Sequence, residues 1–100
     1  MEKVIDKPKT ASKPKIKEPD DYRVILLNDD YTTMDFVVEV LMVIFHKKHE
    51  DAERIMMDVH KKGKGIVGLY SFDIAVTKAD QVHAAARENE FPLRCIVEAV

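Results

Sequence analysis

The feature that most constrains the fold is a sharp change in composition near residue 20. Residues 1–20 hold six of the twelve lysines and three of the four prolines and carry a net charge of +2. This composition is typical of a disordered, solvated extension. Residues 21–100 contain every aromatic residue and all three glycines. Because a domain of this size buries only about 60–65% of its unfolded surface, we expect one small domain with a shallow site rather than a deep enzyme cleft.

Composition excludes several classes of partner. The chain has a formal net charge of −2, so it offers no overall basic surface for nucleic acid or an anionic membrane. Its longest apolar run, residues 36–45, contains Glu39 and falls well short of the ~20 residues that span a bilayer. Cys95 is the single cysteine and cannot form an internal disulfide, which suits a reducing cytoplasm. We therefore expect a cytoplasmic protein.

Three stretches predict β-strands, namely residues 22–27, 66–72 and 93–99. The first is β-branched and aliphatic and ends at a turn-forming Asn-Asp-Asp sequence. In the second, strict alternation places Ile66 and Tyr70 on one face and Val67 and Leu69 on the other. In the third, Leu93, Cys95 and Val97 share a face.

Three further stretches predict helices. The first runs from a cap at Thr32 or Thr33 to about residue 45, the second covers 51–62 with Gly63 as its stop, and the third covers 73–89. The element order is then β-α-α-β-α-β. This order predicts an α+β fold in which three helices pack on one side of a small antiparallel three-stranded sheet.

The first predicted helix is apolar nearly all round, since Asp35 and Glu39 are its only polar residues. Such a helix is normally buried on all sides. One interpretation is a central core helix, which is the more common role for any one of these residues. The other is that part of the helix lines an exposed apolar pocket or contacts a partner, because so small a domain can hardly cover it completely.

Polar residues cluster at the start of that helix. Asn28, Asp29 and Asp30 offer amide and carboxylate oxygens that accept hydrogen bonds from a cation, most naturally an ammonium group. Spacing alone favours a second interpretation, an Asx turn with solvated aspartates. Calcium is a weaker third, because the run lacks the alternating ligands and central glycine of an EF-hand loop.

His60 follows an apolar position at the edge of the second predicted helix. It is either a structural residue or a neutral nitrogen acceptor for a bound group. The remaining histidines are interpreted as solvent-exposed, namely His46, His49 and His83. Cys95 is interpreted as a core residue. An Asp–His hydrolase could be drawn from Asp30 and His60, but no nucleophile is evident.

Four segments together resemble the ClpS adaptor family. Residues 22–37 read YRVILLNDDYTTMDFV and match its opening motif; MMDVHKKG at 56–63, Thr77-Lys78 and ARENEFPL at 86–93 also match. These segments span essentially the whole domain. The resemblance implies a bacterial or plastid protein that recognises destabilising N-terminal residues and hands those substrates to a Clp AAA+ unfoldase. It also implies a fold shared with the C-terminal domain of the ribosomal stalk protein.

The resemblance implies specific roles for the polar cluster. Asn28, Asp30 and His60 would hold the free α-amino group of the substrate, and Asp29 would add negative charge. This is capture of an N-terminal amine. The resemblance implies no cofactor and no metal, and we expect a monomeric, non-enzymatic adaptor that reads N-terminal Leu, Phe, Tyr or Trp. Protonated His60 would repel an ammonium group, so we expect binding to weaken as the pH falls through about 6.5.

The resemblance also implies a side-chain pocket. Its walls would be Leu26, Thr32, Met34, Val37, Met56 and Val59. Met34 matches the family's gate residue, whose bulk is thought to exclude the β-branched side chains of Ile and Val.

A second surface would contact the N-terminal domain of the unfoldase, either ClpA or ClpC. Asp73 and Lys78 match this face, whereas Val76 stands where an acidic residue is common. Another departure is Thr33, where many relatives have proline. Residues 1–20 would either engage the unfoldase during delivery or act as a solubilising leader.

Two alternatives remain at this point. The first is a docking module like the ribosomal stalk domain, with no amine site. The second and weaker alternative is a small hydrolase.

Overall fold

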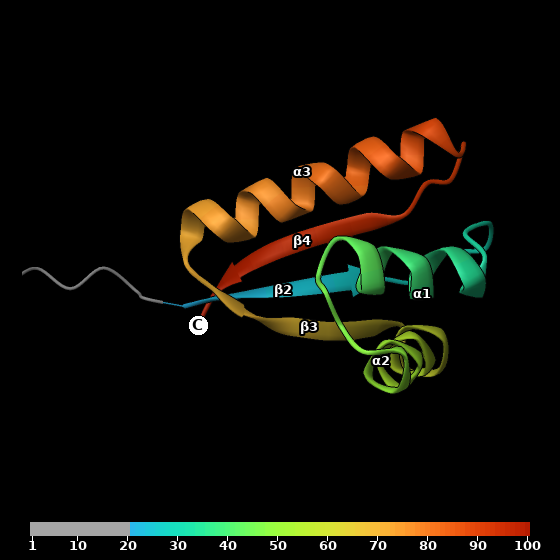
Figure 1. Ribbon diagram of the computed structural model, residues 1–100, viewed down its shortest axis with the longest axis horizontal. Helices are drawn as coiled ribbons and strands as arrows, with labels where there is room; N and C mark the ends of the chain where they lie inside the picture. Colours follow the sequence, from blue (N-terminus) through green and yellow to red (C-terminus); the bar gives the residue numbers. More distant parts are fainter. Residues whose placement is uncertain (1–20) are drawn as a thin grey trace, which may run out of the picture.

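The computed structural model describes residues 21–100, and the predicted extension, residues 1–20, lies outside the described part. The elements are β2 (Tyr22–Leu27), α1 (Met34–Val43), α2 (His49–Lys62), β3 (Lys64–Tyr70), α3 (Phe72–Glu88) and β4 (Arg94–Ala99). The predicted order and the predicted α+β class are confirmed (Figure 1). No helix within residues 21–100 is both long and apolar enough to cross a bilayer.

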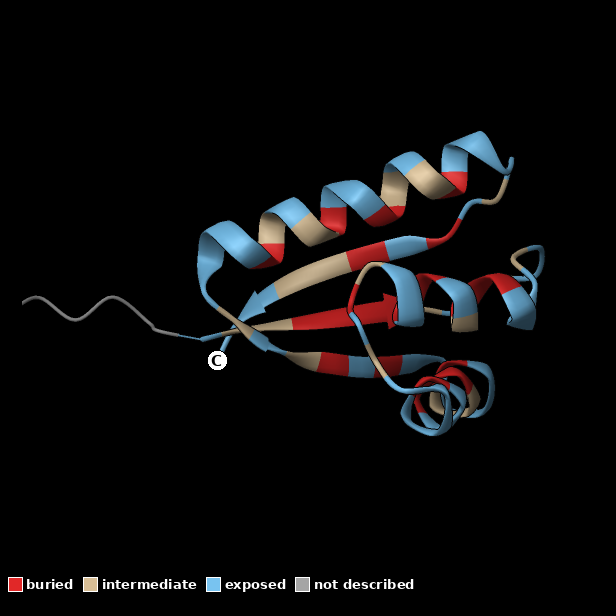
Figure 2. Cartoon of the chain, viewed as in Figure 1, coloured by how far each residue is buried: buried red, intermediate tan, exposed pale blue. Residues whose placement is uncertain are grey.

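The sheet has the order β3-β2-β4, and both pairings are antiparallel. The core lies between the sheet and the helices, where Val24 and Leu26 of the central strand are fully buried. Figure 2 shows buried segments on the sides of the helices that are turned toward the sheet. Burying this single apolar layer is what holds so small a domain together.

The opposite face of the sheet is more exposed, and here one prediction is wrong. Ile66 and Leu69 of β3 are each 53% exposed, whereas Val67 is 3% exposed. Strict alternation would have put Ile66 and Leu69 on different faces. The register shifts where Val24 and Ile25 of β2 meet β3, and an extra residue in one strand reverses which face the following side chains take.

The helices begin and end close to the predicted residues. The Thr33 hydroxyl accepts a hydrogen bond from the Phe36 N–H at 3.1 Å and caps α1, which a proline at that position could not do. Gly63 ends α2 with φ at 89°, the left-handed conformation that glycine adopts without strain. The main difference is that α1 ends at Val43 instead of residue 45, and α2 begins at His49 instead of residue 51.

His83 does not have the predicted surface role. It is half-buried, and its Nε2 accepts a hydrogen bond from the Cys95 N–H at 3.0 Å. Because β4 is an edge strand, this N–H has no neighbouring strand to bond, and a side chain from α3 takes that place. Cys95 is 4% exposed, as predicted for a core residue, and burial raises the pKa of its thiol to about 12.

Candidate functional site

A pocket of about 260 Å³ lies where the turn after β2 and the start of α1 meet α2. The residues that line it are Asn28, Asp29, Asp30, Thr32, Met34, Val37, Met56, Val59 and His60. All nine were predicted from the sequence as amine-binding or pocket residues. Residues that are separated by up to 32 positions in the chain are thus brought around one hollow.

One backbone contact brings the two halves of the pocket together. The N–H of Asn28 donates to the carbonyl oxygen of Gly63 at 2.9 Å. Gly63 is the residue at which α2 ends, so the turn after β2 is tied to the last turn of α2. His60 lies in that last turn and therefore faces the same pocket as Asn28.

The carboxylate of Asp29 organises the turn. Its Oδ1 accepts from the N–H groups of Tyr31 and Thr32 at 2.8 and 2.7 Å, and its Oδ2 accepts from the Thr32 hydroxyl at 2.7 Å. Burial by itself would raise the pKa of Asp29, but these hydrogen bonds outweigh it and hold the pKa below the ordinary value. The Asx-turn interpretation therefore applies to Asp29, which remains charged beside the pocket.

The other polar residues of the pocket have no such internal role. The side-chain hydrogen bonds of this turn, as far as residues 21–100 are concerned, end on Asp29 and not on Asn28 or Asp30. Asn28, Asp30 and His60 are exposed at the pocket. Their oxygen and nitrogen atoms are free to accept hydrogen bonds from a ligand. With two carboxylates and no lysine or arginine among the described lining residues, the pocket favours a cationic group.

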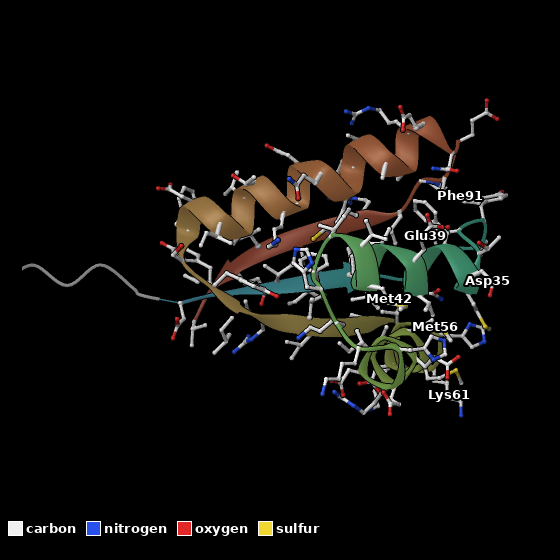
Figure 3. The ribbon with its side chains drawn as sticks, in the orientation of Figure 1. Asp35, Glu39, Met42, Met56, Lys61 and Phe91 are labelled. Carbon is white, nitrogen blue, oxygen red and sulfur yellow. The ribbon has the colours of Figure 1, made fainter. Side chains whose placement is uncertain are left out.

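The other wall of the pocket is apolar. Val37 of α1 and Met56 and Val59 of α2 are between 3% and 9% exposed, whereas Met34 is 43% exposed. In Figure 3 Met56 lies on the side of α2 that faces α1. The pocket is thus polar where β2 ends and apolar between the two helices.

Leu26 is the predicted pocket residue that the structure places elsewhere. It is 0% exposed and belongs to the core beneath the pocket. Leu26 lies on the central strand, with β3 and β4 on either side and helices above, so nothing of its side chain reaches the pocket surface.

The predicted unfoldase-docking residues lie on α3. Asp73 and Lys78 line a shallow groove of about 220 Å³ together with Ile74, which is 49% exposed. The Lys78 ammonium donates to the carbonyl oxygen of Ile44 at 2.8 Å and lies 5.9 Å from the centre of the Phe45 ring. Because α1 has no basic residue in its last turn, Lys78 supplies the positive charge at that helix end.

Within residues 21–100 no group of three His, Cys, Asp or Glu side chains is arranged to hold a metal ion. His49 pairs with Glu53 at 3.5 Å on the outer face of α2. A hydrolase would need a nucleophile whose proton is taken by a neighbouring base. Asp30 and His60 both line the pocket, but the hydroxyl of Thr32, which lines it with them, donates its proton to Asp29.

Comparison with known proteins gives a consistent answer. The family model described as "ATP-dependent Clp protease adaptor protein ClpS" matches residues 17–96. A protein from Syntrophus aciditrophicus named ATP-dependent Clp protease adapter protein ClpS is 62% identical over 86 residues, which cover 86% of this chain and 80% of that protein. A protein of the same name from Acetivibrio thermocellus is 61% identical over 82 residues, covering 82% of this chain and 83% of that protein.

The fold also matches a solved structure, that of Agrobacterium tumefaciens ClpS2 bound to L-phenylalaninamide. The TM-score is 0.79 and the sequence identity is 38%, and the match covers 83% of this chain and 100% of that one. The family model covers well over half of the chain, and the relatives carry the same description. The chain therefore belongs to the ClpS family, whose members are adaptors of the ATP-dependent Clp protease and not enzymes themselves.

Proposed function

We propose that this adaptor binds proteins whose first residue is Leu, Phe, Tyr or Trp and delivers them to the Clp unfoldase, ClpA or ClpC, in the bacterial cytoplasm. The observation that carries the proposal is that the acceptors Asn28, Asp30 and His60 share one pocket with an apolar wall. An N-terminal residue presents both matching groups, an ammonium and a side chain, from the same carbon atom. L-phenylalaninamide, the molecule bound to the related structure, is built in the same way.

The amine is the group that distinguishes a protein's first residue from every internal one. At neutral pH an α-amino group is mostly protonated and offers three hydrogen-bond donors. Asn28, Asp30 and neutral His60 supply three acceptors, and Asp29 adds a second negative charge beside them. A blocked N-terminus loses the charge and two of its donors, so it should bind far more weakly.

The side chain decides which first residues are accepted. Burying a Leu or Phe side chain against Val37, Met56 and Val59 contributes about 1.5–3 kcal/mol, or roughly 10- to 150-fold in affinity over a small residue. Met34 is partly exposed beside these residues, and its position fits a gate that leaves no room for a branch at the β carbon. We therefore expect Leu and Phe to bind well and Ile to bind poorly.

Delivery requires a second surface, and the exposed face of α3 is the one we assign to the unfoldase. Asp73 and Ile74 are exposed there, and neither residue lines the amine-binding pocket. Lys78 lies in the same groove, with its ammonium bonded to α1. An adaptor has to hold substrate and unfoldase together, and the pocket and this face involve different elements.

The proposal can be tested by fluorescence anisotropy with labelled peptides that differ only at residue one, namely Leu, Phe, Ile, Met and N-acetyl-Phe. We expect tight binding of Leu and Phe and weak binding of the other three. Asn28→Ala and His60→Ala should each weaken binding strongly, whereas His49→Ala is the matched control because His49 lies at the other end of α2. If no peptide binds, the chain is a docking module without an amine site, and the proposal is wrong.

A further inference from the structure

A second hollow lies beside the amine-binding pocket, and the sequence patterns did not reveal it. It has a volume of about 170 Å³ and is lined by Leu27, Asn28, Asp29, Pro92 and Arg94. Asn28 and Asp29 also line the first pocket. The two hollows are thus separated only by residues that they share. A chain that leaves the first pocket across Asn28 and Asp29 enters the second.

The second hollow has a different chemistry. Leu27 and Pro92 give it apolar walls, and Arg94 adds a positive charge to the negative charge of Asp29, whereas no lysine or arginine lines the described part of the first pocket. A side chain with an apolar stem and a terminal carboxylate fits such a hollow, and its volume suits one side chain.

Within residues 21–100 the guanidinium of Arg94 forms no ion pair. The ion pairs within residues 21–100 join other residues, namely Arg23–Glu98, Asp51–Arg54, Asp58–Lys62 and His49–Glu53. In the sheet Arg94 pairs across with Leu27, and Leu27 pairs on its other side with Lys64. One end of the open sheet face therefore carries two basic residues that flank Leu27.

We propose that the hollow at Leu27, Pro92 and Arg94 is a second subsite, which takes a glutamate side chain in the substrate segment that follows the N-terminal residue. Arg94 is then a specificity-determining residue of this adaptor. The inference rests on the proposed function, since it needs the first residue of a substrate to occupy the first pocket.

The position of the favoured glutamate follows from two opposing charges. Asp29 lines both hollows and Asp30 lines the first, and both repel a carboxylate that is close to residue one. The benefit should therefore appear only after the chain has passed Asn28 and Asp29. Since each residue extends the chain by at most about 3.3–3.6 Å, positions 2–5 of the substrate cover the neighbourhood of the first pocket.

The test uses the full chain and labelled peptides that begin with Phe and carry either Glu or Gln at one of positions 2–5. For each position the measured quantity is the ratio of the Kd of the Gln peptide to that of the Glu peptide. For the wild type we expect a ratio of about two to five at one or more positions, the size expected of an exposed ion pair. The ratio should fall toward one at high salt.

Three variants locate the effect. Arg94→Gln should abolish the preference for Glu, and Arg94→Lys should retain most of it because the charge remains. Arg54→Gln removes the same charge from the outer face of α2 and is the matched control, which should leave the ratio unchanged. Each variant's binding of the Gln peptide shows that its pocket is intact.

The possible failures are distinguishable. If the Phe peptide with Gln does not bind the wild type at all, the proposed function fails. If it binds, but Arg94→Gln leaves the ratio of Gln to Glu peptide unchanged at every position, the second subsite does not exist.

Discussion

The turn at the head of α1 and the exposed face of α3 both carry charged residues on the surface, but they use them differently. At the turn, the carboxylate of Asp29 accepts three hydrogen bonds from Tyr31 and Thr32. Its neighbour Asp30 lines the pocket and has no hydrogen-bond partner among residues 21–100. On α3, Lys78 is the residue with an internal partner, the carbonyl oxygen of Ile44.

This difference shows which charged residues are available to bind a ligand. A charged group that already satisfies a backbone atom stabilises the fold and gains little from a ligand. A charged group in a hollow without such a partner is available for binding. By this criterion Asp30 serves recognition and Asp29 and Lys78 serve the structure, whereas Asp73 in the α3 groove has no partner among residues 21–100.

The largest expected effect compares the same change in the two regions. Asp30→Ala should weaken binding of a Phe peptide by about 10- to 150-fold, because a hydrogen bond to a charged group contributes about 1.5–3 kcal/mol. Asp73→Ala removes a carboxylate of the same kind from α3 and should change peptide affinity by less than about twofold. Titrations by fluorescence anisotropy measure both. Equal losses in the two variants would contradict the comparison.

The next effect is the dependence of peptide binding on pH. Only a neutral imidazole can accept a hydrogen bond from an ammonium group, so peptide affinity should fall as the solution is acidified if His60 holds the amine. Asp29 stays ionised over this range, because its pKa is lowered in the fold. The measurement is a series of titrations between pH 8 and 5.5. A flat affinity across that range would remove His60 from the amine site.

A smaller effect separates structure from recognition on α3. Lys78→Gln should lower the free energy of unfolding by about 1 kcal/mol, because the end of α1 loses a charged donor. Peptide affinity should stay the same, since Lys78 does not line the pocket. Urea denaturation gives the first quantity and anisotropy gives the second. Lys64→Gln, an exposed residue of β3, is the control and should change stability by less than about 0.5 kcal/mol.

The smallest effect concerns the acid stability of the turn. The pKa of Asp29 lies below its ordinary value of 3.8, so ionised Asp29 stabilises the fold above that pH. This contribution is lost as the pH falls through the lower, folded-state pKa. Asp29→Asn should therefore show a shallower loss of stability than the wild type when urea midpoints are compared from pH 6 downward. Parallel curves for the two proteins would mean that the Asp29 carboxylate adds nothing to the turn.

Most of the fold could be predicted because its signals are local. The Thr33 cap, the Gly63 stop and the β-branched run of β2 each act within a few residues, and each is found in the structure as expected. The errors occurred where the pairing of neighbouring strands determines the face or the burial of a side chain. The shift in register between β2 and β3 places Ile66 and Leu69 on the same face. His83 is not a surface residue, because it accepts a hydrogen bond from an N–H on the unpaired edge of β4.

The candidate site shows the same division. Residues with distinctive chemistry, such as Asn28, Asp30 and His60, could be named from their types and from the family resemblance, and they do line one pocket. Leu26 could not be told apart from a true wall residue, because its burial depends on what lies on either side of the central strand. The hollow at Leu27, Pro92 and Arg94 joins segments 65 residues apart and has no motif of its own.

The sequence by itself determined the order of the elements and the polar and apolar residues that a binding site could use. These follow from composition, periodicity and capping, which are short-range properties of the chain. The tertiary structure alone decided which polar groups remain free. Whether a carboxylate or an ammonium group is available to a ligand depends on the donors and acceptors that packing brings within hydrogen-bonding distance, and those come from distant parts of the chain.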